Sequence, residues 1–314
     1  MNDKLRPGSV RESRGWIWDI KRYALHDGPG VRTTVFFMGC PLRCLWCCNP
    51  ESQPLIGQLC WIENNCLNCD LCLQICPIKA ISRDEQGARK IDRIRCDRCG
   101  LCVEQCPGGA LSLLGRQATV EEILQEVCKD AVFFQRSQGG LTLSGGEPTV
   151  QLDFAGELLR RYKLEEYGHT AMETCGYIQW AELAPLLDFI DLVLYDIKHM
   201  DSVRHRRLTG VDNDLILRNA ACIAETGKKL IVRFPLIPGY NDDSENIIRT
   251  GQFVGDLPGL KQIDLLPYHR LGETKYKRLD QEYALQGTIP PAREQIENAR
   301  QILESLGIRV RVGG

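Results

Sequence analysis

Sixteen cysteines in 314 residues are the feature of this sequence most able to do chemistry. The N-terminus carries charged residues, but it has neither the apolar stretch nor the small-residue cleavage site of an export signal. We therefore expect a cytoplasmic protein, and the cytoplasm keeps thiols reduced. Cysteines in this number are then better interpreted as metal ligands or reactive thiols than as disulfide partners.

Two groups of cysteines repeat the pattern C-x2-C-x2-C-x3-C-P thirty residues apart. Bacterial ferredoxins use this pattern, in which three closely spaced thiolates hold one 4Fe-4S cluster and the fourth binds the other cluster. Zinc is the alternative metal, but zinc sites usually pair two shorter cysteine units rather than running four cysteines into a proline. The pattern therefore predicts one cluster on Cys66, Cys69, Cys72 and Cys106, and a second on Cys96, Cys99, Cys102 and Cys76.

The first group of cysteines has a different spacing, Cys40-x3-Cys44-x2-Cys47, and supplies three ligands without a fourth. A cluster held by three thiolates keeps one iron open to a substrate or cofactor, as catalytic metal sites do. Cys48 follows directly, but adjacent residues point in different directions and rarely bind the same cluster. We expect the first three cysteines to be catalytic ligands and Cys48 to lie near the cofactor without binding metal.

Six apolar or β-branched runs bounded by turn residues predict β-strands at residues 32–38, 140–143, 169–172, 189–195, 229–234 and 262–266. Helical patterns such as VEEILQEVCKD and FAGELLRRYKL lie between most of these runs. This βα order predicts an α/β fold with a parallel sheet. Polar residues follow each predicted strand, and the carboxyl ends of the strands in a βα barrel open on one face. We therefore expect these polar residues to form one site.

The motif C-x3-C-x-aromatic-C, with Trp46 as the aromatic residue, resembles the signature of the radical S-adenosylmethionine (SAM) superfamily. Residues 26–37, HDGPGVRTTVFF, lead into this motif and resemble the glycyl-radical-enzyme activating enzymes, relatives of pyruvate formate-lyase activase. The two ferredoxin-type runs resemble the subgroup of these enzymes that carries two additional 4Fe-4S clusters. The resemblance extends from about residue 16 to residue 312.

The resemblance implies how the chain is divided. Residues 15–52 and 112–314 would form a partial (β/α)6 radical SAM barrel, similar to part of a TIM barrel. Residues 53–111 would form a ferredoxin-like insertion with two 4Fe-4S clusters. Residues 1–14 are a polar leader outside the resemblance, which we expect to be disordered.

The resemblance also implies an activity. The chain would cleave SAM reductively to methionine and a 5'-deoxyadenosyl radical, and this radical would remove a hydrogen atom from a backbone glycine in the C-terminal loop of a partner glycyl radical enzyme. The same resemblance implies three 4Fe-4S clusters and SAM as cofactors. It also implies a flavodoxin or ferredoxin as the electron donor, and a monomeric state. Two other classes stay open at this point: a radical SAM enzyme that acts on a small molecule, and an iron-sulfur electron-transfer protein.

Two motifs after the predicted strands suit SAM binding. Gly145 and Gly146 have no side chains, so their backbone can approach a ligand closely. They belong to SGGEP, which resembles the family loop at the methionine end of SAM and implies that Glu147 lies near the ammonium; the alternative is an ordinary strand-to-helix turn. Asp196 and Lys198 alternate along an extended chain and point to the same side. The resemblance implies that Lys198 is catalytic and neutralises the methionine carboxylate, whereas the alternative is a surface ion pair.

Four further positions match the family. Glu173 and Thr174 match an Asp-Thr pair that binds a monovalent cation in pyruvate formate-lyase activase, although the acid here is one methylene longer. Arg233 and His269 match cofactor-contacting segments, although such residues after an apolar strand are most often structural. No role is predicted for Cys60 or Cys175. The complete set expected to contact SAM is Trp46, Cys47, Cys48, Gly145, Gly146, Glu147, Glu173, Thr174, Asp196, Ile197, Lys198, Arg233 and His269.

Charge and hydropathy exclude two classes of partner. The formal net charge is -2, with Lys and Arg spread along the chain, which is not the pattern of a nucleic-acid-binding protein. No run reaches the roughly 18 apolar residues that a membrane span needs. The 43% hydrophobic content is enough for a full-sized core, and the length fits either one large domain with an insertion or two domains.

Overall fold

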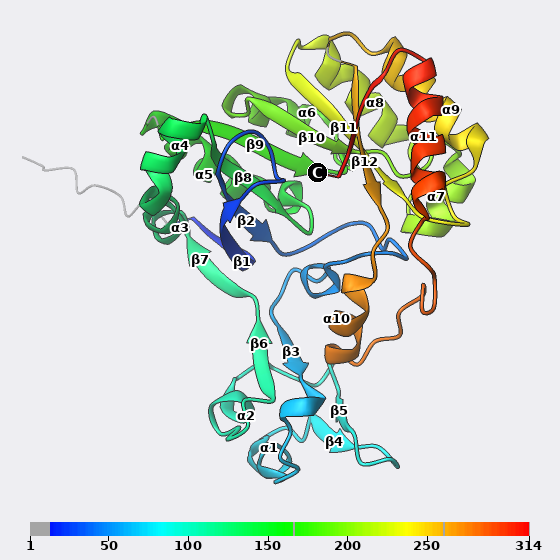
Figure 1. The fold of residues 1–314 in the computed structure, drawn as a ribbon. Coiled ribbons are helices and arrows are strands. Elements are labelled where there is room, and N and C mark those ends of the chain that lie inside the picture. The colour runs from blue at the N-terminus through cyan, green and yellow to red at the C-terminus, as the bar shows by residue number, and fades with distance from the viewer. Residues whose placement is uncertain (1–12, 166, 260, 314) are drawn as a thin grey trace, which may run out of the picture.

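A nine-stranded sheet organises the computed structural model, which describes residues 13–165, 167–259 and 261–313 (Figure 1). The strand order is β13-β12-β11-β10-β9-β8-β2-β1-β7. All neighbours from β13 to β2 are parallel, whereas β1 pairs antiparallel with β2 and β7. The α/β fold and the mostly parallel sheet predicted from the sequence are therefore confirmed. Residues 1–12 of the predicted leader lie outside the described residues, and Arg14 already belongs to β1.

Six strands lie where the apolar runs predict them. β10 begins three residues later than predicted, because residues Ala184–Phe189 form a 3-10 turn that buries Leu186 and Leu187. The run is apolar on both sides of this boundary, so hydropathy alone could not locate it. The six strands are β2 (Arg32–Phe37), β8 (Gly140–Gly145), β9 (His169–Thr174), β10 (Leu192–Asp196), β11 (Lys229–Leu236) and β12 (Gln262–Pro267).

Three strands of the sheet were not predicted: β1 (Arg14–Ala24), β7 (Arg116–Thr119) and β13 (Arg309–Val312). Each mixes charged and apolar residues, and each has only partial burial. β7 and β13 are the edge strands. Neighbouring strands, rather than local hydropathy, decide that these segments are extended.

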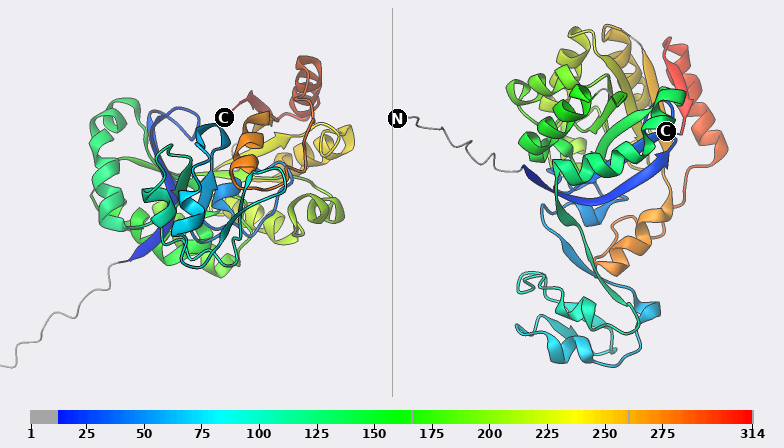
Figure 2. Two further views of the ribbon diagram at one scale, coloured as in Figure 1. Left: turned by 90° about the horizontal axis from the view of Figure 1, so that it is seen from below. Right: turned by 90° about the vertical axis from the view of Figure 1, so that its left-hand side faces the viewer.

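The connecting helices lie along the outer side of the curved sheet (Figures 1 and 2). The main core lies between these helices and the strands, as where Leu158 and Tyr162 of α5 pack with Leu141 of β8. Helix α3 begins with a capping box in which the Thr119 hydroxyl accepts from the Glu122 amide at 3.1 Å. The helices are α3 (Val120–Val127), α4 (Ala131–Ser137), α5 (Leu152–Leu164), α6 (Trp180–Leu183), α7 (Ser202–Thr209), α8 (Asp214–Glu225), α9 (Ser244–Asp256) and α11 (Arg293–Ser305).

A smaller lobe, residues 58–114, projects away from the sheet (Figures 1 and 2). Its stem is the antiparallel pair β3 (Gln58–Trp61) and β6 (Leu111–Leu114), and its body holds the antiparallel pair β4 (Ile81–Arg83) and β5 (Arg89–Ile91). Two short helices, α1 (Leu71–Ile75) and α2 (Leu101–Glu104), complete it. Its small hydrophobic core consists of Leu59, Ile81, Ile91, Cys102 and Leu111.

Helix α10 (Glu273–Arg278) pairs with the main unit through Lys275 Nζ, which lies 2.7 Å from Glu51 Oε1, and the residues that follow the helix contact the lobe. The Arg93 guanidinium of the lobe donates to the carbonyl of Leu59 at 2.9 Å and to the carbonyl of Leu279, which follows α10. Carbonyls at a helix end lack partners within the helix, so an arginine donor is a natural partner there. Lys90 Nζ also pairs with Asp280 Oδ1 at 2.5 Å. The lobe is thus attached at its stem and at the end of α10.

Within the part of the chain that the structure describes, no helix is both long and apolar enough to cross a membrane.

The attachment can be tested with Arg93→Met. Losing the donor to both carbonyls should cost about 1–2 kcal/mol locally, which would raise amide hydrogen exchange in residues 275–283 by roughly 5–30-fold. Arg95→Met is the matched control, because Arg95 donates to the Ile78 carbonyl inside the lobe at 2.6 Å. Equal exchange in the two variants, measured by mass spectrometry, would contradict the attachment.

Candidate active site

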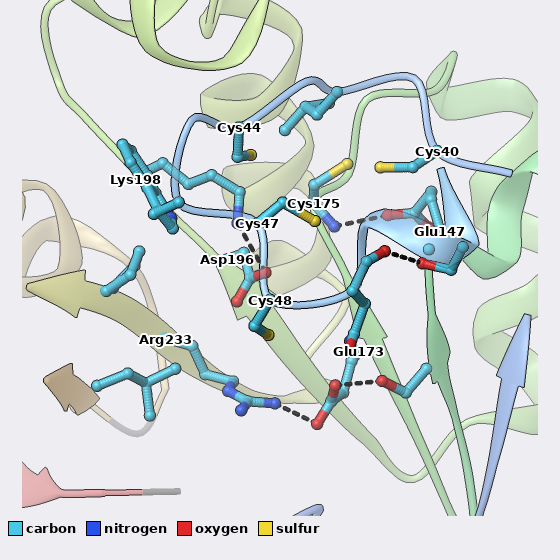
Figure 3. A pocket seen from close by; sticks show the side chains of 18 of the residues that line it. Cys40, Cys44, Cys47, Cys48, Glu147, Glu173, Cys175, Asp196, Lys198 and Arg233 are labelled. Atoms are coloured by element: carbon cyan, nitrogen blue, oxygen red, sulfur yellow. Dashed lines mark hydrogen bonds and ion pairs between the residues drawn. The ribbon is translucent and has the colours of Figure 1, made fainter. Parts of the chain in front are cut away.

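A cavity of about 250 Å³ lies at the carboxyl ends of the parallel strands β8 to β12 (Figure 3). The first cysteine group lines one part of it, and the polar residues after the strands line the rest. The lining residues are Cys40, Leu42, Cys44, Trp46, Cys47, Cys48, Asn49, Ser52, Gln53, Ser144, Gly145, Gly146, Glu147, Glu173, Thr174, Cys175, Asp196, Lys198, Arg233, Pro235, Ile237, Leu266, Pro267, Tyr268 and His269.

The cavity brings together all the residues expected to contact SAM except Ile197. The Ile197 side chain is buried in the main hydrophobic core and does not line the cavity. Successive side chains of an extended segment point to opposite sides, so Asp196 and Lys198 line the cavity while Ile197 packs behind them. Contact of Ile197 with SAM therefore stays a prediction, and it would have to come from the backbone of this residue, because its side chain lies in the core.

The three spaced cysteines lie in the loop that follows β2. Backbone bonds tie this loop to other segments: the Arg43 amide donates to the Thr209 carbonyl at 2.6 Å, and the Cys40 amide donates to the Gln53 carbonyl at 3.0 Å. Burial raises the pKa of the Cys40 thiol to about 11 and that of the Cys44 thiol to about 12. Metal binding here must therefore release protons from the thiols.

The glycine loop after β8 lies directly against the start of this cysteine loop. The Gly146 amide donates to the Phe37 carbonyl at 2.8 Å, and the Glu147 amide donates to the Gly39 carbonyl at 2.7 Å. A Cβ atom on Gly146 would lie only 2.3 Å from the Gly39 carbonyl oxygen. Gly145 has a φ of +113°, which disfavours residues with a side chain. Both glycines are thus needed for the contact between the two loops.

The Glu147 carboxylate holds the glycine loop against the end of β9. Its Oε1 accepts from the hydroxyls of Thr149 and Thr174, each at 2.8 Å, and from the Thr149 amide at 3.2 Å. Its Oε2 accepts from the Cys175 amide at 2.8 Å. Each carboxylate oxygen has two lone pairs, so Oε2 has room for one further donor.

Two ion pairs lie beside each other in the cavity (Figure 3). Lys198 Nζ lies 2.9 Å from Asp196 Oδ2, and the Arg233 guanidinium donates to Glu173. Burial alone would lower the pKa of Lys198, but the Asp196 carboxylate raises it above its ordinary value, so Lys198 is a cation. Burial raises the pKa of Glu173 against the opposing attraction of Arg233.

Ser144 and Cys175 line the cavity although the sequence predicts no role for either. The Ser144 hydroxyl donates to Glu173 Oε2 at 2.5 Å, and Ser144 is the first residue of the SGGEP motif. Its place in this motif could have marked Ser144 as a site residue. Its hydrogen bond to Glu173 could not be predicted from the sequence, because the two residues are 29 positions apart. Cys60, for which the sequence also predicts no role, is buried in β3 of the lobe.

Two smaller cavities in the lobe are lined by the eight cysteines of the two repeated runs. Cys66, Cys69, Cys72 and Cys106 line one of them, and Cys76, Cys96, Cys99 and Cys102 line the other. This is the grouping that the ferredoxin pattern predicts, including the exchange of the fourth cysteine. Among the described residues, no three or more His, Cys, Asp or Glu side chains are arranged to hold a single metal ion. Each set of thiols instead surrounds a space.

Arginine N–H groups that are buried without a hydrogen-bond partner show whether the cavities suit anionic groups. Arg233 Nε in the main cavity, and Arg89 Nε and Nη1 in the cavity lined by Cys66, are buried and have no hydrogen-bond partner among the described residues. Iron-sulfur clusters with thiolate ligands accept such N–H donors at their sulfurs, and the carboxylate of SAM accepts them at its oxygens. The residues present therefore fit these groups.

Comparison with known proteins agrees with this site. Residues 34–251 match the model of the radical SAM superfamily. The chain therefore belongs to the radical SAM superfamily, whose members hold a 4Fe-4S cluster and SAM.

Three similar proteins define the family more narrowly. The isethionate sulfite-lyase activating enzyme of Nitratidesulfovibrio vulgaris is 44% identical over 87% of this chain and 90% of that protein. The choline trimethylamine-lyase activating enzyme of Oleidesulfovibrio alaskensis is 42% identical over 88% and 90%, and the trans-4-hydroxy-L-proline dehydratase activating enzyme of Clostridioides difficile is 38% identical over 95% and 99%. This chain is a member of the family of glycyl radical enzyme activating enzymes.

The contact between the two loops can be tested with Gly146→Ala. Overpacking costs about 1–3 kcal/mol, so SAM affinity should fall by roughly 5–150-fold. Iron retention should fall with it, because the added methyl group displaces the cysteine loop. Gly156→Ala is the matched control: its Cβ would meet only the end of the Leu186 side chain, at 3.2 Å. Iron analysis and equilibrium dialysis with SAM are the measurements. Unchanged SAM affinity in Gly146→Ala would contradict the role of this contact.

Proposed function

We propose that the main cavity binds a 4Fe-4S cluster and SAM together and uses them to place a radical on a glycine of a partner glycyl radical enzyme. The observation that carries this proposal is that the spaced cysteines, the glycine loop and the Asp196–Lys198 pair line one cavity. When bound, the reduced cluster and SAM supply a 5'-deoxyadenosyl radical, which removes a hydrogen atom from the glycine.

Individual residues would divide this work between binding and orientation. Cys40, Cys44 and Cys47 would hold the cluster. The Lys198 cation would bind the methionine carboxylate, and Asp196, at 2.9 Å, holds the Lys198 amino group in place. The backbone of Gly145 and Gly146 would lie along the methionine end of SAM.

The hydrogen bonds that Glu147 and Glu173 already make limit what each carboxylate could bind. The remaining lone pair of Glu147 Oε2 suits the SAM ammonium, because every other lone pair of this carboxylate already has a donor. Glu173 is paired with Arg233, so a monovalent cation at this position would compete with a guanidinium. This pairing counts against the cation that the resemblance implies. Trp46, Cys48, Thr174 and His269 would complete the walls around SAM.

The lobe would be a ferredoxin-like insertion, predicted at residues 53–111, that carries two further 4Fe-4S clusters beside a partial (β/α)6 barrel. Two sets of four thiols around separate cavities support this content. Electrons from a flavodoxin or ferredoxin in the cytoplasm would pass through these two clusters to the cluster in the main cavity. The enzyme would be a monomer. The competing role is docking of the partner, with the clusters present because so small a hydrophobic core needs metal binding to fold.

An anaerobic reaction tests the activity. The reduced, iron-reconstituted chain would be mixed with SAM and, in turn, with isethionate sulfite-lyase, choline trimethylamine-lyase and trans-4-hydroxy-L-proline dehydratase. We expect one of these proteins to give a glycyl doublet in electron paramagnetic resonance, with matching 5'-deoxyadenosine, and the Lys198→Met variant to give neither at comparable iron content. 5'-Deoxyadenosine formed with a small molecule as the hydrogen donor, and no doublet on any partner, would favour the small-molecule alternative.

The exchange of cysteines between the two lobe sites makes a separate prediction. Cys66→Ser and Cys106→Ser should weaken the same cluster although they are 40 residues apart, whereas Cys102→Ser should weaken the other one although it is close to Cys106. The iron content of each variant should be about 8 atoms per chain, compared with about 12 in the unmodified chain. Electron paramagnetic resonance identifies the lost signal; the same signal lost in Cys102→Ser and Cys106→Ser would contradict the exchange.

A further inference from the structure

The two cysteine cavities of the lobe differ at one equivalent position. The sequence repeat of thirty residues relates Leu59 to Arg89, each seven residues before the first cysteine of its run. Leu59 lines the cavity of Cys76, Cys96, Cys99 and Cys102, and Arg89 lines the cavity of Cys66, Cys69, Cys72 and Cys106. A buried arginine thus stands in one site where the other has an aliphatic side chain.

The Arg89 guanidinium is only partly satisfied by protein groups. Its side chain is 2% exposed, and its Nη2 lies 2.6 Å from Asp70 Oδ1. Its Nε and Nη1 are buried and have no hydrogen-bond partner among the described residues. Since a buried N–H group without a partner is costly, these two donors indicate an acceptor inside the cavity.

The charges around the two cavities also differ. Arg83 binds the same Asp70 oxygen at 2.7 Å, so two guanidinium groups share one carboxylate and one positive charge remains uncompensated. Among the described residues, Arg89 is the one charged residue that lines its cavity, whereas the other cavity is lined by Arg98 and Asp97, whose formal charges cancel. The Arg93 guanidinium is near that second cavity but does not line it, and it donates to the carbonyls of Leu59 and Leu279. Positive charge and N–H groups directed at cluster sulfurs favour the reduced cluster, which carries the additional electron.

The two cavities lie at different depths in the lobe. Leu59 and Leu113 line the site without the arginine, whereas Trp61 and Leu111 line the site of Arg89. Strand β3 leaves the main unit at Gln58, and β6 returns to it after Leu114 (Figure 1). The site without the arginine is therefore nearer to the main cavity, and the Arg89 site lies at the far end.

We propose that Arg89 raises the reduction potential of the far cluster above that of the near cluster, so that the far cluster accepts the electron first and the near cluster is the stronger reductant. This inference rests on the two additional clusters of the proposed function. One electron leaves a reduced low-potential flavodoxin or ferredoxin, which is oxidised by one electron, and enters the far cluster, which is reduced by one electron. No covalent bond forms or breaks in this step.

A redox titration of the reconstituted full chain, followed by electron paramagnetic resonance, tests the proposal. Arg89→Met should lower one midpoint potential by at least about 59 mV, which is a tenfold change in the ratio of reduced to oxidised cluster for a one-electron couple. Combination with Cys106→Ser should remove the shifted signal and so assign it to the far site. An unshifted far cluster, or a shift of the near cluster instead, would overturn the proposal.

Arg83→Met is the matched control. This substitution also removes a positive charge and a donor to Asp70, but the Arg83 side chain does not line the cavity. It should shift the potential much less than Arg89→Met. Arg89→Gln is the second variant and decides the matter if Arg89→Met does not retain the cluster: it keeps N–H donors but removes the charge, so a lower potential is again expected and an unchanged one contradicts the proposal.

Failure of this inference can be distinguished from failure of the proposed function. Iron content near four atoms per chain, or no 5'-deoxyadenosine with titanium(III) citrate as a small reductant, would contradict the cluster content or the SAM chemistry. Full iron content and normal SAM cleavage, together with unshifted potentials in Arg89→Met and Arg89→Gln, would contradict only the role of Arg89.

Discussion

The backbone of Gly146 lies so close to Gly39 that no side chain fits between them, and the rest of the site depends on this contact. It holds the end of β8 against the start of the cysteine loop, and the amide of Glu147 bonds across it at 2.7 Å. The Glu147 carboxylate then extends the connection to Thr174 and Cys175 at the end of β9. A continuous set of hydrogen bonds thus positions the loop of the three spaced cysteines, the glycine loop and the next strand end relative to one another.

Charge is arranged differently in the main cavity and in the lobe. In the main cavity, cations and carboxylates are paired, so that Lys198 stays protonated despite its burial and faces a space bordered by thiols. In the lobe, Arg89 shares a carboxylate with Arg83 and keeps unpaired donors toward the cysteine cavity. The first arrangement suits a cofactor with both an ammonium and a carboxylate, and the second suits an anionic cluster that gains an electron.

The lobe buries few hydrophobic side chains of its own. Its core consists of a few side chains, one of them the cysteine Cys102. Metal binding can supply folding free energy where a core is this small. The Arg93 bonds and the Lys90–Asp280 pair then fix the direction in which the lobe projects, so that the near cysteine cavity lies on the side of the main unit.

Much of this protein could be predicted from the sequence because the relevant signals are local. The spacing of the cysteines, the apolar strands with polar residues at their ends and the glycine pair are each contained in a short segment, and the six strands with their parallel order follow from them. Strands β1, β7 and β13 could not be predicted in this way, because pairing with neighbouring strands stabilises segments of mixed polarity.

The sequence by itself thus determined the number of thiols and their spacing along the chain, and this spacing decides which thiols could hold one cluster. The tertiary structure decided which distant side chains meet: Glu173 with Arg233, Ser144 with Glu173, and Arg89 with the cysteines of the far site. It also placed Ile197 in the core. These contacts join segments tens of residues apart or depend on which side of a strand faces the core, so packing of the whole chain, and no local pattern, selects them.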